Sequence, residues 1–320
     1  MYKESDLASV PERTEAQAPF SRRVLDSSDS AADPRLPEDP KRRSEGPERP
    51  DKITSAPIED VQGRGDTRGI RLECAGVTDV RYPAMAVDPG GTPRPTIVNL
   101  EMSVSVPAES KGTHMSRFIE IVQNDERALN PEGMVRILKT MQSRLKANEA
   151  RLAVDFPMFM EREAPVTKSK GMIDIGCGFV GTIEGETIDL VQKVVVTVTS
   201  LCPCSKEISE YGAHNQRGAL TLEVKTRKDA DGQPITMPTG ELIFAAEESA
   251  SCRIYPVLKR PDERWITMEA YENPVFVEDM VRGVAERLMQ DDRIESFKVH
   301  ARNFESIHGH DAFASTSWSR

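Results

Sequence analysis

The chain has 320 residues, of which 38% are hydrophobic, 52 are acidic and 42 are basic. This length can fill one large core or two modest ones, but the low hydrophobic fraction predicts that part of the chain stays unfolded. The net charge of -10 argues against non-specific nucleic-acid binding, because proteins of that kind carry a basic face. We therefore expect no nucleic-acid partner, and any anionic ligand must be held by a local cluster of cations.

The first six residues, MYKESD, contain two acids and no apolar run, which fits neither a secretory signal nor a transit peptide. No stretch reaches the roughly 18 apolar residues that a membrane-spanning helix needs. The five cysteines are odd in number and unevenly spaced, which favours free thiols or metal ligands over a disulfide framework. The sequence thus predicts a cytoplasmic protein with no membrane partner.

Residues 1–56 are rich in Pro, Ser, Arg, Asp and Glu. Such a segment buries too little apolar surface to offset the conformational entropy of folding, so we predict a disordered tail. A partner-docking arm is the alternative, but no amphipathic or aromatic pattern supports it.

Past the tail, alternating apolar and polar residues predict a strand at 100–106. A helix is predicted next, because Asn130 can cap it and Pro131 suits its first position. Its apolar stripe has spacings of three and four residues and consists of Met134, Ile137, Leu138, Met141 and Leu145. Further strands are predicted at 173–183, 194–199 and 220–224.

A second helix is predicted to open at Asn273-Pro274, 143 residues after Asn130, with a stripe of the same spacings. Extended segments follow the two helices, at 154–156 and 297–299. We interpret this repetition as an α+β fold of two related modules, residues 57–188 and 189–320, each an antiparallel sheet backed by helices. A chance likeness between two ordinary amphipathic helices is the alternative.

The segment between the strands at 194–199 and 220–224 is the most unusual one in the chain, and Pro203 bends it away from continued strand. Cys202 and His214 lie twelve residues apart there, and such a pair can share a metal ion or act as nucleophile and base. The segment lacks the paired C-x-x-C units of a structural zinc site, which favours an open site with ligands from elsewhere. The alternative is small buried thiols beside a hydrogen-bonded histidine, as we expect for Cys177 on its strand and Cys252 at a predicted helix end.

Four segments of the chain have distinctive sequences: KGTHMSRF (111–118), CPCSKEIS followed by YGAHNQR (202–217), LKRPDE (258–263) and NFESIHGH (303–310). In this order they resemble the motifs of the type IB GTP cyclohydrolases. The resemblance extends from about residue 57 to the end of the chain. It implies the tunnelling fold, with two ββααββ modules per subunit, and a homotetramer with active sites between subunits. It also implies a reaction in which GTP and water give formate and 7,8-dihydroneopterin triphosphate, the first step towards tetrahydrofolate.

The resemblance further implies a divalent metal, Zn²⁺, Mn²⁺ or Fe²⁺, that lowers the pKa of the water attacking C8 of the purine. Cys202 and His214 are its first two expected ligands. Glu248 is the expected third ligand, preferred over Glu247 from the position of the motif. Cys204 is expected beside the site, where it could exchange with Cys202.

Roles towards GTP follow from the same resemblance. Glu263 is similar to the carboxylate that anchors guanine through N1–H and the 2-amino group. His308 or His310 is expected to transfer protons, with His308 preferred. His114 is a candidate substrate contact with a helix-start or interface role equally open, and His300 is expected to be structural or solvated. The cations inside the motifs are candidates for the triphosphate: Lys206, Arg217, Lys259, Arg260, Lys111 and Arg117.

Other readings of these residues stay open. Cys202 could be a covalent nucleophile in another tunnelling-fold enzyme acting on a purine or pterin, similar to a nitrile reductase. The chain could also be a metal-buffering or redox-sensing protein that uses Cys202, Cys204 and His214 without turnover. Glu263 alone could be a surface ion-pair partner of its arginine neighbours. Testing whether turnover requires a metal would distinguish these possibilities.

Overall fold

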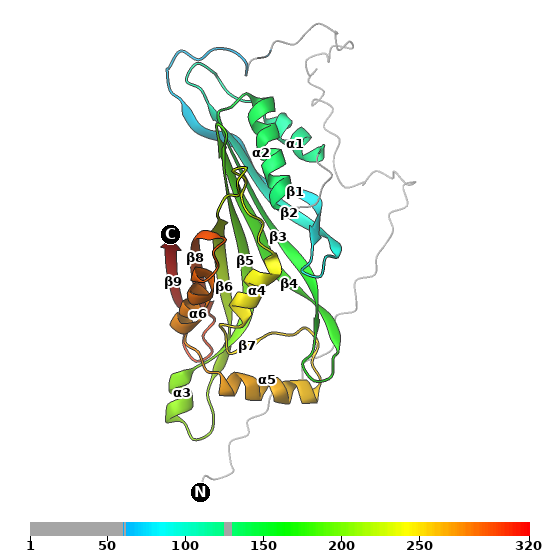
Figure 1. Ribbon diagram of the computed structural model, residues 1–320, viewed down its shortest axis with the longest axis vertical. Coiled ribbons are helices and arrows are strands. Elements are labelled where there is room, and N and C mark those ends of the chain that lie inside the picture. The colour runs from blue at the N-terminus through cyan, green and yellow to red at the C-terminus, as the bar shows by residue number, and fades with distance from the viewer. Residues whose placement is uncertain (1–59, 61, 125–129) are drawn as a thin grey trace, which may run out of the picture. The chain divides into compact units, whose positions relative to one another are not determined.

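The protein is described by a computed structural model that covers residues 60, 62–124 and 130–320 (Figure 1). Residues Glu59–Arg320 form one compact unit. The tail predicted at 1–56 lies outside the described residues. None of the helices in the described part is both long and apolar enough to cross a membrane.

The first half of the folded unit has the element order ββααββ. Its elements are β1 (Leu72–Val87), β2 (Pro93–Val106), α1 (Met115–Gln123), α2 (Pro131–Leu145), β3 (Glu149–Glu163) and β4 (Lys170–Glu184). The strands predicted at 100–106 and 173–183 lie in β2 and β4, and the extended segment at 154–156 lies in β3.

The second half repeats this order with additional elements. Its elements are β5 (Thr187–Leu201), α3 (Pro203–Ile208), β6 (Asn215–Thr226), α4 (Thr239–Glu247), β7 (Cys252–Arg253), α5 (Arg260–Glu272), α6 (Val277–Met289), β8 (Ile294–Asn303) and β9 (Ala312–Ser319). The α+β class and the two tandem ββααββ modules predicted from the sequence are confirmed. The division between residues 188 and 189 stays a prediction, and the first strand of the second half begins at Thr187.

All strands belong to one antiparallel sheet in the order β1-β2-β3-β4-β5-β6-β8-β9, with β7 paired to β5 (Figure 1). Helix α2 packs on β3 and β4, α4 packs on β5, and α6 packs on β8 and β9. Every second residue of β5 and β6 is therefore buried under helices, as Val194, Val196, Leu220 and Leu222 are. The alternate residues, such as Thr199 opposite Arg217, lie on the other face of the sheet.

The helix starts differ from the sequence prediction in one case. Asn130 caps α2 as predicted, because its side-chain oxygen accepts a 2.8 Å hydrogen bond from the Gly133 amide. Asn273, however, ends α5 and donates its side-chain amide to the Ala250 carbonyl. Helix α6 starts at Val277, where Asp279 accepts a hydrogen bond from the Phe276 amide. The prediction of a helix opening at Asn273-Pro274 was therefore wrong.

One end of the sheet carries the elements that matter for function. We call it the site end and define it by Leu201, the last residue of β5, and its partner Asn215, the first residue of β6. Helix α5 crosses this end between α3 and the loop from β3 to β4 (Figure 1). Asp262 joins the start of α5 to that loop, and Tyr271 joins its end to α3.

Candidate active site

Cys202 and His214 face each other across the neck of the β5–β6 connection. They follow directly on the Leu201–Asn215 pair, and the Cys202 amide donates a 3.1 Å hydrogen bond to the His214 carbonyl. Gly212, with a φ of 138°, provides the turn that returns the chain to β6, in a conformation that side chains rarely permit. The two residues predicted as metal ligands are thus brought together by the sheet itself.

Ser205 links the two ends of this connection through hydrogen bonds. Its hydroxyl donates to the Cys202 carbonyl at 3.1 Å and accepts from the His214 amide at 3.2 Å. Its own amide donates to the Cys202 sulfur at 3.4 Å, which fixes the thiol at the start of α3. Cys202 is half-buried, so its sulfur is accessible to a ligand.

The ring of His214 is held through one nitrogen. Its Nδ1 lies 3.0 Å from Oε1 of Gln216, a residue that is 8% exposed, and 3.4 Å from the Ser306 hydroxyl. A Gln oxygen is an acceptor, so the contact favours the tautomer with hydrogen on Nδ1. Nε2 then carries the lone pair, which is the arrangement found in metal-binding histidines.

The loop between β8 and β9 brings two further imidazoles to the site end. Ser306 of this loop contacts His214, and the rings of His308 and His310 stack with centroids 5.2 Å apart. They line a cavity of about 750 Å³ together with His300 and Arg302 of β8. His300, expected to be structural or solvated, packs on Phe313 at a cavity wall beside His308 and His310.

The two glutamates at the end of α4 have different surroundings. Glu247 is buried, forms an ion pair with the buried Arg162, and lies 3.6 Å from Nε of Arg253. Glu248 is 38% exposed and pairs through Oε1 with Arg253 at 2.7 Å. This difference favours Glu248 as the residue that can bind a ligand, because Glu247 is held in the protein interior.

The remaining cysteines fall into two groups. Burial raises the pKa of Cys177 to about 12 and that of Cys252 to about 11, so both are protonated, unreactive thiols. Cys252 lies in β7, so its predicted position at a helix end was wrong. Cys204 is exposed in α3, two residues from Cys202, while Cys74 is exposed in the edge strand β1.

The cations predicted to meet the triphosphate lie at different places. Lys206 of α3 donates to the Tyr271 carbonyl and lies 4.5 Å from the centre of the Tyr271 ring, so it joins α3 to α5. Arg217 is exposed near the start of β6, and its carbonyl accepts from the Phe304 amide. Lys259 is exposed just before α5.

Glu263 lies in the first turn of α5 and is exposed. The turn is fixed by its neighbour Asp262, which is fully buried and accepts hydrogen bonds from the Val166, Thr167 and Lys259 amides and from the Thr167 hydroxyl. Eight residues separate Glu263 from Tyr271, which corresponds to about 12 Å of helix. The contacts of α5 therefore hold Glu263 at the end of the helix that faces away from α3.

Replacing Asp262 by Asn is expected to lower the melting temperature by several degrees at neutral pH, because an amide cannot accept all four hydrogen bonds. These bonds depress the pKa of Asp262 far below its ordinary value of 3.8. Its stabilisation is therefore complete above that value and fades as the pH falls from 3.8 towards the folded-state pKa. Thermal unfolding of both proteins between pH 7 and pH 3 checks this: the difference must shrink with acid, and a constant difference contradicts it.

His114 lies at the opposite end of the sheet. It precedes α1, and its Nε2 contacts Asp60 at 3.1 Å. Residue pairing across β3 and β4 places the end of β2, after which α1 begins, at the same end of the sheet as the beginning of β5. Cys202 follows the other end of β5. The fifteen residues of β5 span about 50 Å. A single subunit therefore does not bring His114 to Cys202.

The donor set at the site end suits a divalent metal in part. The backbones of Cys202 and His214 are hydrogen-bonded to each other, and the Nδ1 contact of His214 with Gln216 leaves the lone pair on Nε2. Within the described residues, however, no three His, Cys, Asp or Glu side chains are grouped closely enough to hold one ion. Glu248 is connected to this end through Ser251, whose hydroxyl accepts from the Leu201 amide at 2.9 Å. The chemistry of this donor set, a thiol and an imidazole with the exposed Glu248 carboxylate as a third candidate, fits a divalent metal.

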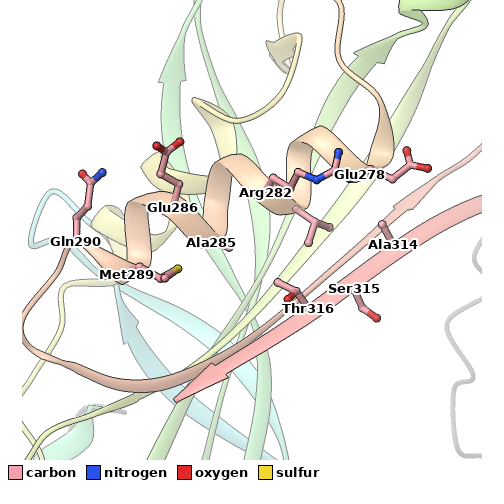
Figure 2. A pocket seen from close by; sticks show the side chains of 10 residues that line it. Glu278, Arg282, Ala285, Glu286, Met289, Gln290, Ala314, Ser315 and Thr316 are labelled. Atoms are coloured by element: carbon pink, nitrogen blue, oxygen red, sulfur yellow. The ribbon is translucent and has the colours of Figure 1, made fainter. Parts of the chain in front are cut away.

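A second cavity lies away from this chemistry. It measures about 610 Å³ and lies between α6 and β9, with Arg282, Met289 and Thr316 among the residues on its walls (Figure 2). It is lined by no thiol and no imidazole. We therefore assign it no part in the reaction.

Sequence reasoning missed the residues that hold the site together. Ser205, Gln216 and Ser306 all lie inside the recognised motifs, but we expected no role for them. Arg302 could have been found from strand alternation, because it stands two residues after His300 and shares its face of β8.

The fold and the site thus define an α+β protein in which a cysteine and a histidine adjoin at one end of the sheet, and the neighbouring β8–β9 loop contributes to an imidazole-lined cavity. A family model for type I GTP cyclohydrolase folE2 matches residues 58–314. GTP cyclohydrolase FolE2 of Nitrosococcus oceani is 45% identical over 258 residues, which cover 81% of this chain and 94% of that protein. The protein of the same name from Nitrosomonas eutropha is 44% identical over 264 residues, 82% of this chain and 96% of its own. The chain belongs to the type I GTP cyclohydrolase FolE2 family.

Solved structures with a similar backbone arrangement have much lower sequence identity to this chain. Uricase from Arthrobacter globiformis is 11% identical, with a TM-score of 0.46 over 77% of this chain and 93% of its own. Urate oxidase from Bacillus subtilis is 10% identical, with a TM-score of 0.45 over 77% of this chain and 98% of its own.

Proposed function

We propose that this chain is a metal-dependent GTP cyclohydrolase of the IB type that converts GTP and water to formate and 7,8-dihydroneopterin triphosphate, the first step towards tetrahydrofolate. Membership of the family, matched over residues 58–314, supports the cyclohydrolase activity. The observation that carries the finer assignment is the pairing of Cys202 with His214 at the neck of the β5–β6 connection.

In this proposal Cys202, His214 and Glu248 hold the metal, which is Zn²⁺, Mn²⁺ or Fe²⁺. A cation held there would lower the pKa of a water molecule and so supply hydroxide for attack on C8 of the purine at neutral pH. Gln216 keeps the His214 ring turned so that Nε2 is available, and Ser205 keeps the two ligands at a fixed separation. Cys204, exposed two residues further along α3, can exchange with Cys202.

His308 and His310 move protons during ring opening. Their loop is anchored beside His214 through Ser306, so an imidazole of this loop can deliver a proton to N7 of the purine. N7 protonation matters because the five-membered ring is otherwise a poor electrophile. The stacked pair lines a large open cavity, which has room for a nucleotide.

Glu263 recognises guanine, since its two carboxylate oxygens match N1–H and the 2-amino group. Adenine would leave this carboxylate unpaired, which is a strong basis for rejection. Because Glu263 lies at the end of α5 that faces away from α3, we assign it to the site of a neighbouring subunit. The outer side of α5 supports a subunit contact there, because Trp265, Met268 and Tyr271 are all exposed.

The same reasoning applies to the other candidate GTP contacts that a single subunit does not bring close to Cys202. His114 and Lys259 reach GTP from a neighbouring subunit, while Lys206 and Arg217 lie close to Cys202 in sequence and approach the triphosphate from the same subunit. We propose a homotetramer with sites between subunits, in the cytoplasm, acting on GTP alone and not on nucleic acid or membranes.

Removing the metal is expected to abolish turnover. Purified protein incubated with GTP and Mn²⁺ or Zn²⁺ should release formate and a product that becomes a fluorescent pterin on oxidation. Exhaustive chelation should reduce both signals to background, and returning the cation should restore both. Product formation that continues unchanged without metal would point to Cys202 as a covalent nucleophile. Tight zinc uptake without any product would instead indicate a metal-binding protein.

A further inference from the structure

Beside the candidate site, four charged side chains form a chain of contacts from the core to Glu248. Arg162 of β3 and Glu247 of α4 form its buried end, with side chains only 7% and 4% exposed. Nε of Arg253 in β7 lies 3.6 Å from Oε2 of Glu247, and its Nη2 lies 2.7 Å from Oε1 of Glu248. Arg253 therefore connects a buried carboxylate to an exposed one.

The buried end of this chain is a fixed anchor. A buried Arg–Glu pair is costly to desolvate and becomes strongly destabilising when one partner is lost, so neither side chain moves away easily. Arg162 also donates to the Ile254 carbonyl at 3.3 Å, directly beside Arg253. The Arg253 guanidinium thus contacts both glutamates at the end of α4, and Arg162 of β3 acts on it through Glu247.

The exposed end meets the residue assigned to the metal. Arg253 donates a hydrogen bond to Oε1 of Glu248, whereas within the described residues Oε2 accepts no hydrogen bond. Nη2 of Arg287 also donates to the Glu248 carbonyl at 3.4 Å, which restrains the backbone at this point. A carboxylate with one oxygen held and the other open is the usual state of a metal ligand supported by a second hydrogen-bond partner.

We propose that Arg253 is a positioning residue for the metal site, held in place by the buried Arg162–Glu247 pair and presenting Oε2 of Glu248 to the cation. This inference rests on the proposed role of Glu248 as third ligand. The two adjacent glutamates then have different roles: Glu247 orients Arg253, and Glu248 binds the cation.

Replacing Arg253 by Met is expected to weaken Zn²⁺ binding by about 10–100-fold, the usual loss for a group that supports a metal ligand. The measurement is competition for Zn²⁺ alone between the full-length protein and a chromophoric chelator. Arg253→Lys should recover part of the affinity, because it restores a cation without the planar fork. Glu247→Gln should weaken binding in the same direction, since it releases the other side of Arg253.

Two controls separate positioning from general damage. Arg144→Met removes an ion pair of similar exposure, with Glu120 at 2.8 Å, and should leave Zn²⁺ affinity unchanged. In a Glu248→Gln background, Arg253→Met should change affinity by less than about twofold, because its effect acts through Glu248. A structural defect would instead lower affinity in both backgrounds.

The outcomes distinguish this inference from the proposed function. If the unaltered protein binds Zn²⁺ and Arg253→Met binds it equally well or more tightly, the positioning role is wrong while the metal site stands. If the unaltered protein fails to bind Zn²⁺, the metal site and the positioning role both fall. Should Arg253→Met not fold, Arg253→Lys measured in the unaltered and in the Glu248→Gln backgrounds decides the question, because a positioning role predicts a loss of Zn²⁺ affinity only in the first.

Discussion

Replacing Cys202 by Ala is expected to reduce GTP turnover by about 1,000-fold or more, on the scale seen when a group central to the chemistry is removed. The fold fixes this thiol at the start of α3, because the Ser205 amide donates to its sulfur and its backbone is bonded to His214. Metal content should fall together with activity, since an imidazole and a single carboxylate make a much weaker site. Formate release and the zinc content of purified protein are the two measurements.

The fold should survive this substitution. Cys202 is only half-buried, so truncating its side chain leaves little cavity in the core. Cys74→Ala is the matched control, because that thiol is exposed in the edge strand β1, and it should leave turnover and metal content unchanged. A Cys202→Ala protein that retains more than about a tenth of normal activity would assign the thiol a structural role.

The local part of the site could be predicted from sequence because two regular strands enclose it. The β-branched run in β5 and the alternation in β6 mark two strands, so the connection between them could be recognised, and its ends had to meet. Once Leu201 pairs with Asn215, Cys202 and His214 must be neighbours. The neighbouring hydrogen bonds of Ser205 and Gln216 were missed, because a hydroxyl or amide in a loop has many possible partners that sequence does not distinguish.

Of the two predicted helix starts, one was correct and one was wrong, for a physical reason. Asn130 and Asn273 stand in similar sequence contexts, yet only Asn130 caps a following helix. The side chain of Asn273 is drawn instead to the Ala250 carbonyl, 23 residues away in the chain, while Asp279 caps α6. A tertiary contact thus overrode a local signal. Strand β1 escaped prediction because it is a largely exposed edge strand with two register shifts, which weaken the alternation.

The long-range part of the site lies beyond what periodicity can reveal. Glu263 and Cys202 belong to separate motifs, and their separation depends on how α5 crosses the end of the sheet. The same holds for Glu247 and Glu248, adjacent in sequence yet different in burial, because Arg162 approaches from β3. Only the fold determines which of two identical side chains is held inside and which is available.

Mixing two inactive variants is expected to restore activity if each site uses Cys202 from one subunit and Glu263 from another. Cys202→Ala lacks a metal ligand, and Glu263→Gln should lose at least about 100-fold in turnover through poorer pairing with guanine. In randomly mixed oligomers about a quarter of the sites combine an intact Cys202 with an intact Glu263, so about a quarter of normal activity should return. Co-expressed chains with different affinity tags, purified through both tags, provide the mixed oligomers for the assay.

The matched control for this experiment is a mixture of Cys202→Ala with His214→Ala. Both residues lie on the same β5–β6 connection, so every site in that mixture carries one defect, and activity should stay at background. Mixed Cys202→Ala and Glu263→Gln oligomers that remain as inactive as their parents would mean that one subunit supplies both groups. Helix α5 would then have to move towards α3 by much of its length, against the buried contacts of Asp262 at one end and the Lys206–Tyr271 contact at the other.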